Sequence, residues 1–450
     1  MTDGAVLPKK RKRMKNTQLV AMSFAAVILI GTLLLCLPFS SAAGEWSDPI
    51  DCFFTATSAT CVTGLVVYDT PTHWSLFGQI VLLILIQIGG IGFMTLITAV
   101  SFFVHRQINL HERRMLQDSV GALHLGGVGG VFSQILIGTF CIEAIGVALL
   151  SLRFYPMYGE IGIWYAVFHS VSAFCNAGMD LVGAGGVSLT AFQSDPLVSG
   201  TMMFLIIMGG LGFLVWNDLL HTGLRWKKMK LHTKMVLAIS GALILIGWGA
   251  FLITDYNGAF AGLSFGDKLL ASLFQSVTTR TAGFFTVPQD QLSNSGFLMS
   301  LVLMFVGGSP GSTAGGVKTT TFAVFFLNII RLSANRESVV VFKRRIHNRM
   351  VRQAGAVIGV YLGLILISTF LICLLEPTLT LKSVLYEVVS AMATVGLSMG
   401  ATPTLGVASK LLLIFLMYAG RLGGMSIFLA LTRNDDGAPT ERPVEKILIG

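Results

Sequence analysis

Long apolar stretches alternate with short polar ones along most of this chain of 450 residues. Apolar runs of about 20–25 residues are long enough to cross a lipid bilayer as helices, whereas runs of about 10–14 residues are too short. A long run, a short run and a second long run follow one another in this order four times. The pattern predicts an all-α membrane protein with eight transmembrane helices and four re-entrant helices. We expect the first helices at 18–40, 130–153, 235–255 and 351–375, the short helices at 50–60, 162–174, 267–279 and 381–392, and the second helices at 76–104, 197–220, 296–330 and 408–432.

This order divides the chain into four repeats with predicted pseudo-fourfold symmetry. Each repeat crosses the membrane twice, so the segments between repeats and both termini fall on one side. The segments within a repeat, next to the short helix, fall on the other side and are called the outer loops. The expected repeats are 18–104, 130–220, 235–330 and 351–432, and the expected loops and tails are 1–17, 105–129, 221–234, 331–350 and 433–450.

Each short helix is followed by a polar segment that ends in glycine. The glycines are 114, 105 and 113 residues apart, which is close enough for a fourfold internal repeat. The C-terminal end of a helix carries roughly half a negative charge, and rings of backbone carbonyls replace the water shell of a monovalent cation. We therefore predict one ion filter built from main-chain oxygens. Its residues would be Val62, Thr63, Gly64, Asn176, Ala177, Gly178, Thr281, Ala282, Gly283, Thr394, Val395 and Gly396.

The third of the second helices is expected to be broken. Five glycines and one proline between positions 307 and 318 cannot hold a regular helix. Non-helical backbone at membrane depth is tolerated where protein buries it or where it lines a watery cavity, so a gate below the filter is predicted here. The segment is a near miss for the phosphate-binding GxxxxGK[ST] motif, with one residue too many before the lysine. The predicted gate consists of Gly307, Gly308, Ser309, Pro310, Gly311, Ser312, Thr313, Ala314, Gly315, Gly316 and Lys318, together with Arg421.

Composition and charge place the chain in a membrane. Hydrophobic residues make up 54% and charged residues 12%, about half the charged share of a soluble domain, and the mean hydropathy is +0.76. Lysine and arginine concentrate at 9–15, 106–114, 225–234 and 331–352. This positive-inside pattern assigns both termini to the cytoplasm. The formal net charge of +9 therefore does not indicate a nucleic-acid partner.

Isolated charges in apolar surroundings are candidates for function, because each is costly unless it is paired. Arg280 lies beside a filter segment, where its charge would repel a cation, so we expect it to point away towards a carboxylate. Glu387 and Arg421 are expected to form or complete such a buried ion pair. Lys318 and Arg421 are also expected to restrain the gate, and Glu143 is a further candidate.

The four glycine segments, the broken helix and Arg421 resemble the Trk/Ktr/HKT superfamily of potassium transporters, over nearly the whole chain. The chain is most similar to the membrane subunits of bacterial Ktr systems, with no extra N-terminal helix pair and a short tail. Glycine at all four filter positions matches the potassium-selective members, in which serine at position 64 would have indicated sodium.

This resemblance implies potassium uptake, typically stimulated by sodium, in a bacterial cell membrane. It also implies a homodimer with one pore in each protomer. A cytoplasmic ring of RCK-type, KtrA-like subunits would bind ATP or ADP and control the gate, so no nucleotide is expected on this chain. The expected docking surface is 105–118, 221–234 and 331–352.

Two other classes of function fit the sequence less well. A sodium-coupled secondary cation symporter with inverted repeats would place its discontinuous helices in halves of opposite orientation, whereas all four repeats here run the same way. An enzyme would need a metal-ligating cluster or a nucleophile with its base. Neither is evident, because the histidines are few and lie mostly in the predicted loops, and the six cysteines form no CxxC pair. The sequence therefore favours a transporter that is not an enzyme.

Overall fold

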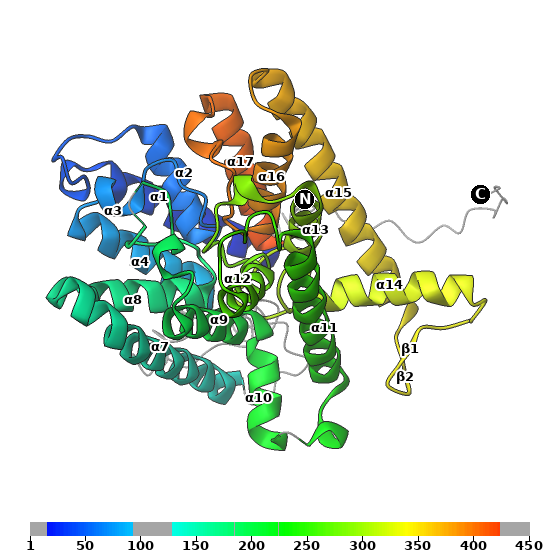
Figure 1. Cartoon of the computed structure of the whole chain (residues 1–450). Helices are drawn as coiled ribbons and strands as arrows, with labels where there is room; N and C mark the ends of the chain where they lie inside the picture. Colours follow the sequence, from blue (N-terminus) through cyan, green and yellow to red (C-terminus); the bar gives the residue numbers. More distant parts are fainter. Residues whose placement is uncertain (1–15, 93–127, 184, 224, 424–450) are drawn as a thin grey trace, which may run out of the picture.

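The computed structural model describes residues 16–92, 128–183, 185–223 and 225–423, and most of this part of the chain is helical (Figure 1). The elements of the first half are α1 Asn16–Cys36, η1 Pro38–Ser40, α2 Pro49–Thr60, α3 Thr70–His73, α4 Leu76–Ile91, α7 Val128–Tyr158, α8 Glu160–Cys175, η2 Thr190–Phe192, α9 Pro196–Leu211 and α10 Phe213–Thr222. Those of the second half are η3 Trp226–Lys228, α11 Leu231–Thr254, α12 Phe265–Thr278, η4 Gln289–Gln291, α13 Asn294–Phe305, α14 Thr319–Ser333, β1 Val340–Val341, β2 Arg344–Arg345, α15 Asn348–Leu375, α16 Leu381–Ala393, η5 Thr402–Thr404 and α17 Val407–Leu422.

Three of the four short helices begin at a side-chain cap. The carboxylate of Asp48 accepts hydrogen bonds from the amides of Ile50 and Asp51 at the start of α2. Ser264 and Thr380 cap α12 and α16 in the same way. Such caps satisfy amides that have no partner within the helix. They therefore stabilise the start of each of these three short helices.

The long and short helices pack in a closed cycle. Each first helix (α1, α7, α11 and α15) contacts the short helix that follows it (α2, α8, α12 and α16). Each second helix contacts the short helix of the next repeat, so α4 packs on α8, α9 on α12 and α13 on α16. The cycle closes where α17 contacts α2, and there Lys410 forms a 2.6 Å ion pair with Asp51.

Glycines of the second helices allow this close packing. A Cβ added to Gly89 would collide with the carbonyl oxygen of Thr60, and one added to Gly209 would collide with that of Phe174. Gly420 stands in the same relation to the carbonyl oxygen of Met392. In each case a second helix touches the backbone near the C-terminal end of a short helix, so small residues bring these elements into contact.

The second helix of the second repeat differs from the expected continuous helix. It breaks at Gly212 into α9 and α10, which are bent by 93°. Gly212 has φ +93°, a backbone conformation that residues with a Cβ rarely adopt. The amide of Phe213, at the start of α10, donates to the carbonyl of Gly311 at 2.9 Å. The break thus exposes backbone groups that bind the predicted gate.

Three described helices are long and apolar enough to cross a membrane, namely Gln134–Tyr158, Leu231–Thr254 and Asn348–Leu375. The bent pair α9 and α10 would add one more, and four shorter apolar helices include α4 and the two halves on either side of the predicted gate. The eight crossings therefore remain a prediction. Residues 93–127, most of the N-terminal segment 1–17 and the tail 433–450 lie outside the described residues.

A methyl group at Gly209 should destabilise the protein. Gly209→Ala would drive a Cβ into the carbonyl of Phe174, and overpacking of this kind costs about 1–3 kcal/mol. The control is Gly200→Ala in the same helix, where nothing lies within 4 Å of the added Cβ, and where alanine is the better helix former. Thermal unfolding of the detergent-solubilised protein should show a lower midpoint for Gly209→Ala alone. Equal midpoints for the two variants would contradict the packing described above.

Candidate functional site

The four predicted filter segments meet in a closed ring. A Cβ on Gly64 would collide with the carbonyl oxygen of Ala177, next to Gly178 in the second segment. Gly178 stands against Ala282 and Gly283 in the third, and Gly283 against Val395 and Gly396 in the fourth. Gly396 returns to Thr63 and Gly64. The structure thus brings together the segments 62–64, 176–178, 281–283 and 394–396 around one centre.

The filter segments share an unusual backbone conformation. In each, the first residue has φ between 51° and 70° and the glycine two positions later has φ between 68° and 94°. The residue between them is not among those with positive φ. In an extended strand successive residues point to opposite sides. Positive φ at every second residue of the filter segments turns the peptide groups so that this alternation is lost. Carbonyls of consecutive residues can therefore face the same side, as a ring of ligands for a cation requires.

Hydroxyl groups on the short helices hold the filter segments in place. The Ser58 hydroxyl accepts from the amide of Gly64, and the Ser390 hydroxyl accepts from that of Gly396, each at 3.0 Å. Ser172 donates to the carbonyl of Met179 at 2.7 Å, and Thr278 donates to that of Phe284. These bonds use side chains behind the ring to orient the main chain within it.

Several buried oxygens around the ring have no hydrogen-bond partner among the described residues. They are the hydroxyls of Thr60, Thr63 and Thr394 and the amide oxygen of Asn176. Buried polar atoms are normally satisfied by protein, water or an ion. Four helix C-termini also point their partial negative charge at this centre. These oxygens therefore fit a dehydrated monovalent cation. The described residues contain no group of three or more His, Cys, Asp or Glu that could hold a resident metal ion.

The predicted gate, residues 307–318 and hereafter the gate loop, lies beside the ring and is largely buried. The amides of Ser309 and Thr313 donate to the carbonyls of Gly210 and Gly209 at the broken end of α9, at 3.0 and 3.3 Å. The Thr313 hydroxyl donates to the carbonyl of Phe174 at 3.1 Å. Because the loop is not helical, its amides lack helical hydrogen-bond partners. They bind carbonyls of α9 instead, which satisfies them at membrane depth.

Two cations hold the gate loop. The guanidinium of Arg421 donates to the carbonyl of Thr313 in the loop and to that of Gly89 at the end of α4. It also donates to the carbonyl of Gly90 at 3.2 Å. The ammonium of Lys318 donates to the carbonyl of Ala314 at 2.6 Å. The structure thus places both residues where the sequence suggested, although their role in gating stays a prediction.

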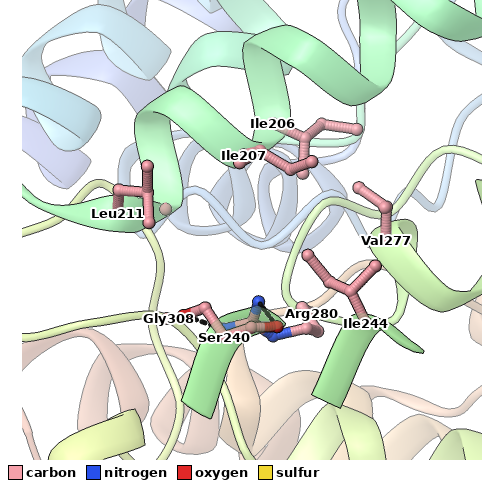
Figure 2. A pocket seen from close by; sticks show the side chains of 9 residues that line it. Ile206, Ile207, Leu211, Ser240, Ile244, Val277, Arg280 and Gly308 are labelled. Carbon is pink, nitrogen blue, oxygen red and sulfur yellow. Dashed lines mark hydrogen bonds between the residues drawn. The ribbon is translucent and has the colours of Figure 1, made fainter. Parts of the chain in front are cut away.

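Among the described residues, neither Arg280 nor Glu387 forms the ion pair expected of it. Arg280 donates to the hydroxyl of Ser240 at 3.1 Å and to the carbonyl of Gly307 at 3.5 Å. Figure 2 shows its guanidinium beside Ser240 and Gly308, at a cavity of about 20 Å³ that has room for about one water molecule. Arg280 therefore binds backbone and hydroxyl oxygens near the gate loop, because the broken elements leave carbonyls free there.

Glu387 lies in α16, and hydroxyl groups hydrogen-bond to its carboxylate. Its carboxylate accepts from Ser398 at 2.5 Å and from Thr402 at 2.7 Å. The amide of Met399 donates to it at 3.3 Å. Among the described residues the ion pairs are Arg153 with Asp195 and Lys410 with Asp51, so neither Glu387 nor Arg421 completes one.

A polar chain behind the second filter segment includes one residue that the sequence analysis missed. Gln87 donates from its amide to both carboxylate oxygens of Glu143, at 3.0 and 3.2 Å. The thiol of Cys175, directly before Asn176, donates to the Gln87 oxygen at 3.5 Å. The available signal was a glutamine deep in the apolar run 76–91, about two turns beyond Gln79 near the start of that run.

Acidic side chains lie in the predicted outer loops, close to the filter segments along the chain. Asp180 follows Gly178 by two positions and accepts from the amide of Gly183 at 3.0 Å. Burial raises the pKa of the Asp180 carboxyl to about 6. Asp69 accepts from the amides of Gly185 and Gly186 at 3.1 and 3.2 Å, which joins the outer loops of the first two repeats.

Comparison with known proteins gives consistent relatives. Residues 5–436 match the model of the TrkH family, described as a cation transport protein. The chain is 38% identical over 447 residues to the potassium/sodium uptake protein NtpJ of Enterococcus hirae, covering 98% of each chain. It is 36% identical to the Ktr system potassium uptake protein B of Bacillus subtilis, covering 94% of each. The fold resembles the solved potassium transporter TrkH of Vibrio parahaemolyticus, with a TM-score of 0.74 at 17% identity, over 94% of this chain and 86% of that one.

Release of the gate loop should increase cation flux. Arg421→Ala removes the bonds to Thr313 and Gly89, and Lys318→Ala removes the bond to Ala314. We expect a several-fold higher maximal flux at an unchanged half-saturating cation concentration, measured with a radioactive tracer in proteoliposomes. Lys382→Ala is the control, because this lysine also donates to a carbonyl, that of Leu292, but at the outer end of α16. Unchanged kinetics in both gate variants would refute the assignment.

External pH should change the apparent affinity for the cation. Above about pH 6 the Asp180 carboxyl is charged and attracts cations to the ring, and below that pH it is neutral. The half-saturating cation concentration should therefore rise as external pH falls from 7 to 5. Asp180→Asn should give a high, pH-independent value, whereas Asp290→Asn, at an exposed outer position, should behave like the wild type. An unaltered pH profile in Asp180→Asn would count against this role.

Proposed function

The chain belongs to the TrkH family of cation transport proteins, and from this premise we propose that it carries potassium into the cell through the ring of filter segments. The observation that carries the proposal is the closed contact of the four glycine segments, from Gly64 through Gly178 and Gly283 and back from Gly396. Two relatives with more than one third identity over nearly the full length are named as potassium or potassium/sodium uptake proteins.

Selectivity would come from the main chain of the filter. The side chains at the first two filter positions differ between repeats, whereas glycine occupies the third position in all four. Main-chain oxygens at fixed separation replace the hydration shell of one alkali ion better than that of another. The hydroxyls of Ser58 and Ser390 would keep this separation constant.

The gate loop would control the flow. Its contacts with α9, with the end of α8 at Phe174 and with Arg421 describe a conformation in which it lies against the ring. Opening would have to break these bonds. The loop continues directly into α14, which begins at Thr319, so movement of α14 would be transmitted to it.

Control would come from the cytoplasm. We infer a homodimer in which each protomer has its own pore, and a ring of RCK-type subunits that binds ATP or ADP and docks on the basic loops. Within the described part of these loops, Trp226 and Phe342 pack edge to face at 5.8 Å, so 225–234 and 331–352 offer one joined surface.

Sodium would stimulate the transport. Both termini would lie in the cytoplasm of a bacterial cell, and eight helices would cross its membrane.

Growth rescue tests the proposal. A strain that lacks potassium uptake should grow at low potassium when it expresses the wild-type chain. Gly64→Ser should lose the preference for potassium over sodium, because Gly64 has φ +94° and its added Cβ would meet the Ala177 carbonyl. A deletion of 308–316 should conduct without control.

Gly44→Ser is the matched control for the filter variant. Gly44 also has positive φ, +72°, but nothing lies within 4 Å of an added Cβ, so it shares the backbone strain without the collision. This variant should rescue growth like the wild type. Full potassium preference in Gly64→Ser would refute the filter assignment.

A further inference from the structure

A groove of about 540 Å³ lies between α14 and the start of α15. In Figure 1 these two helices meet at an angle beside the β-hairpin. The groove combines two arginines and two asparagines with an apolar wall. Its lining consists of Phe325, Asn328, Arg331, Asn348, Val351, Arg352, Gly355 and Ala356.

The cations of this groove have no carboxylate partner among the described residues. Neither Arg331 nor Arg352 takes part in either of the ion pairs there, and the lining contains no acidic side chain. Arg331 donates from Nη1 to the carbonyl of Glu337 at 3.3 Å. Its Nε–H is buried and has no hydrogen-bond partner in this part of the chain. The groove therefore holds a surplus of positive charge and an unused donor.

One acceptor in the groove is also unused. The amide oxygen of Asn328, one turn before Arg331 on α14, is buried without a hydrogen-bond partner in the described ranges. A ligand that satisfies the groove must hence offer both negative oxygens for the arginines and a hydroxyl or similar donor for Asn328.

The surroundings of the groove are apolar. On α14, Phe326, Ile329 and Ile330 are 54%, 44% and 47% exposed. On α15, the exposed Met350 is followed by the apolar stretch that is long enough to span a membrane. A groove lined by two arginines, with exposed large aliphatic and aromatic side chains beside it, suits the boundary between lipid head groups and acyl chains.

We propose that this groove binds the phosphodiester head group of an anionic phospholipid of the cytoplasmic leaflet. Arg331 and Arg352 would donate to the phosphate oxygens, which guanidinium groups recognise well. Asn328 would accept from a hydroxyl of the head group, and Phe325 and Val351 would contact the glycerol and upper acyl chain. Basic pockets between helices on the cytoplasmic side are suited to such lipids.

The site has a mechanical consequence. The lipid would bridge α14, which begins directly after the gate loop at Thr319, and α15, which begins at Asn348. A bound head group would therefore fix the end of α14 that lies farthest from the loop. Binding itself rests only on the membrane environment of the chain, so it can be tested without any transport measurement.

Native mass spectrometry of the detergent-solubilised full chain tests the proposal. Phosphatidylglycerol should be retained by the wild type, and phosphatidylcholine should not. The double variant Arg331→Gln/Arg352→Gln should bind phosphatidylglycerol about tenfold more weakly. Arg349→Gln is the matched control, because it removes one positive charge from the exposed start of α15 outside the groove lining, and it should change binding by less than twofold.

Further measurements distinguish a lipid head-group site from other causes of lipid retention. Arg331→Lys/Arg352→Lys should recover part of the binding, and an unchanged melting temperature of the glutamine variant should show that the fold is intact. Equal retention of the two lipids would overturn the proposal in favour of a non-specific acyl contact. Competition by free glycerol phosphate at the same concentration as the lipid would overturn it in favour of a soluble phosphate ligand. An altered oligomeric state with unaltered lipid binding would identify the face as a contact between copies of the chain.

Discussion

Close approach of backbone to backbone is the constraint on which this structure depends. The four filter segments contact one another through Cα atoms and carbonyl oxygens, and no side chain could be inserted at Gly64, Gly178, Gly283 or Gly396 without moving a neighbour. The same constraint recurs one layer farther out, where Gly89 and Gly209 press against carbonyls near the ends of the short helices. Four helix ends of like partial charge are thus brought together. A cation at their centre would offset the repulsion between these partial negative charges.

The position of the gate loop also depends on contacts between backbone groups. A loop at membrane depth must find a partner for each amide and carbonyl, and the broken second helix supplies them. The bend at Gly212 frees the carbonyls of Gly209 and Gly210 for the loop, and the loop returns a carbonyl to Phe213. The break in one repeat and the loop in another are therefore two halves of one arrangement.

Free carbonyls also explain where the buried charges bind. Arg421, Arg280 and Lys318 all donate to main-chain oxygens of the gate loop or of its neighbours. Glu387 is solvated instead by the hydroxyls of Ser398 and Thr402. Backbone carbonyls are an alternative to a carboxylate as partners for a cation at membrane depth, and they introduce no second buried charge. The expected ion pairs failed because residue type alone does not show how many carbonyls a broken helix leaves free.

The sequence by itself determined the apolar helices, the four glycine segments, the irregular loop at 307–318 and the charges that bind it, because each depends on local composition or on spacing along the chain. Only the tertiary structure decided which carbonyl faces which glycine, the break at Gly212, and the partners of Arg280, Glu387 and Gln87. These contacts join residues that are tens to hundreds of positions apart. Their geometry depends on how whole helices pack, and no local pattern of residues encodes that.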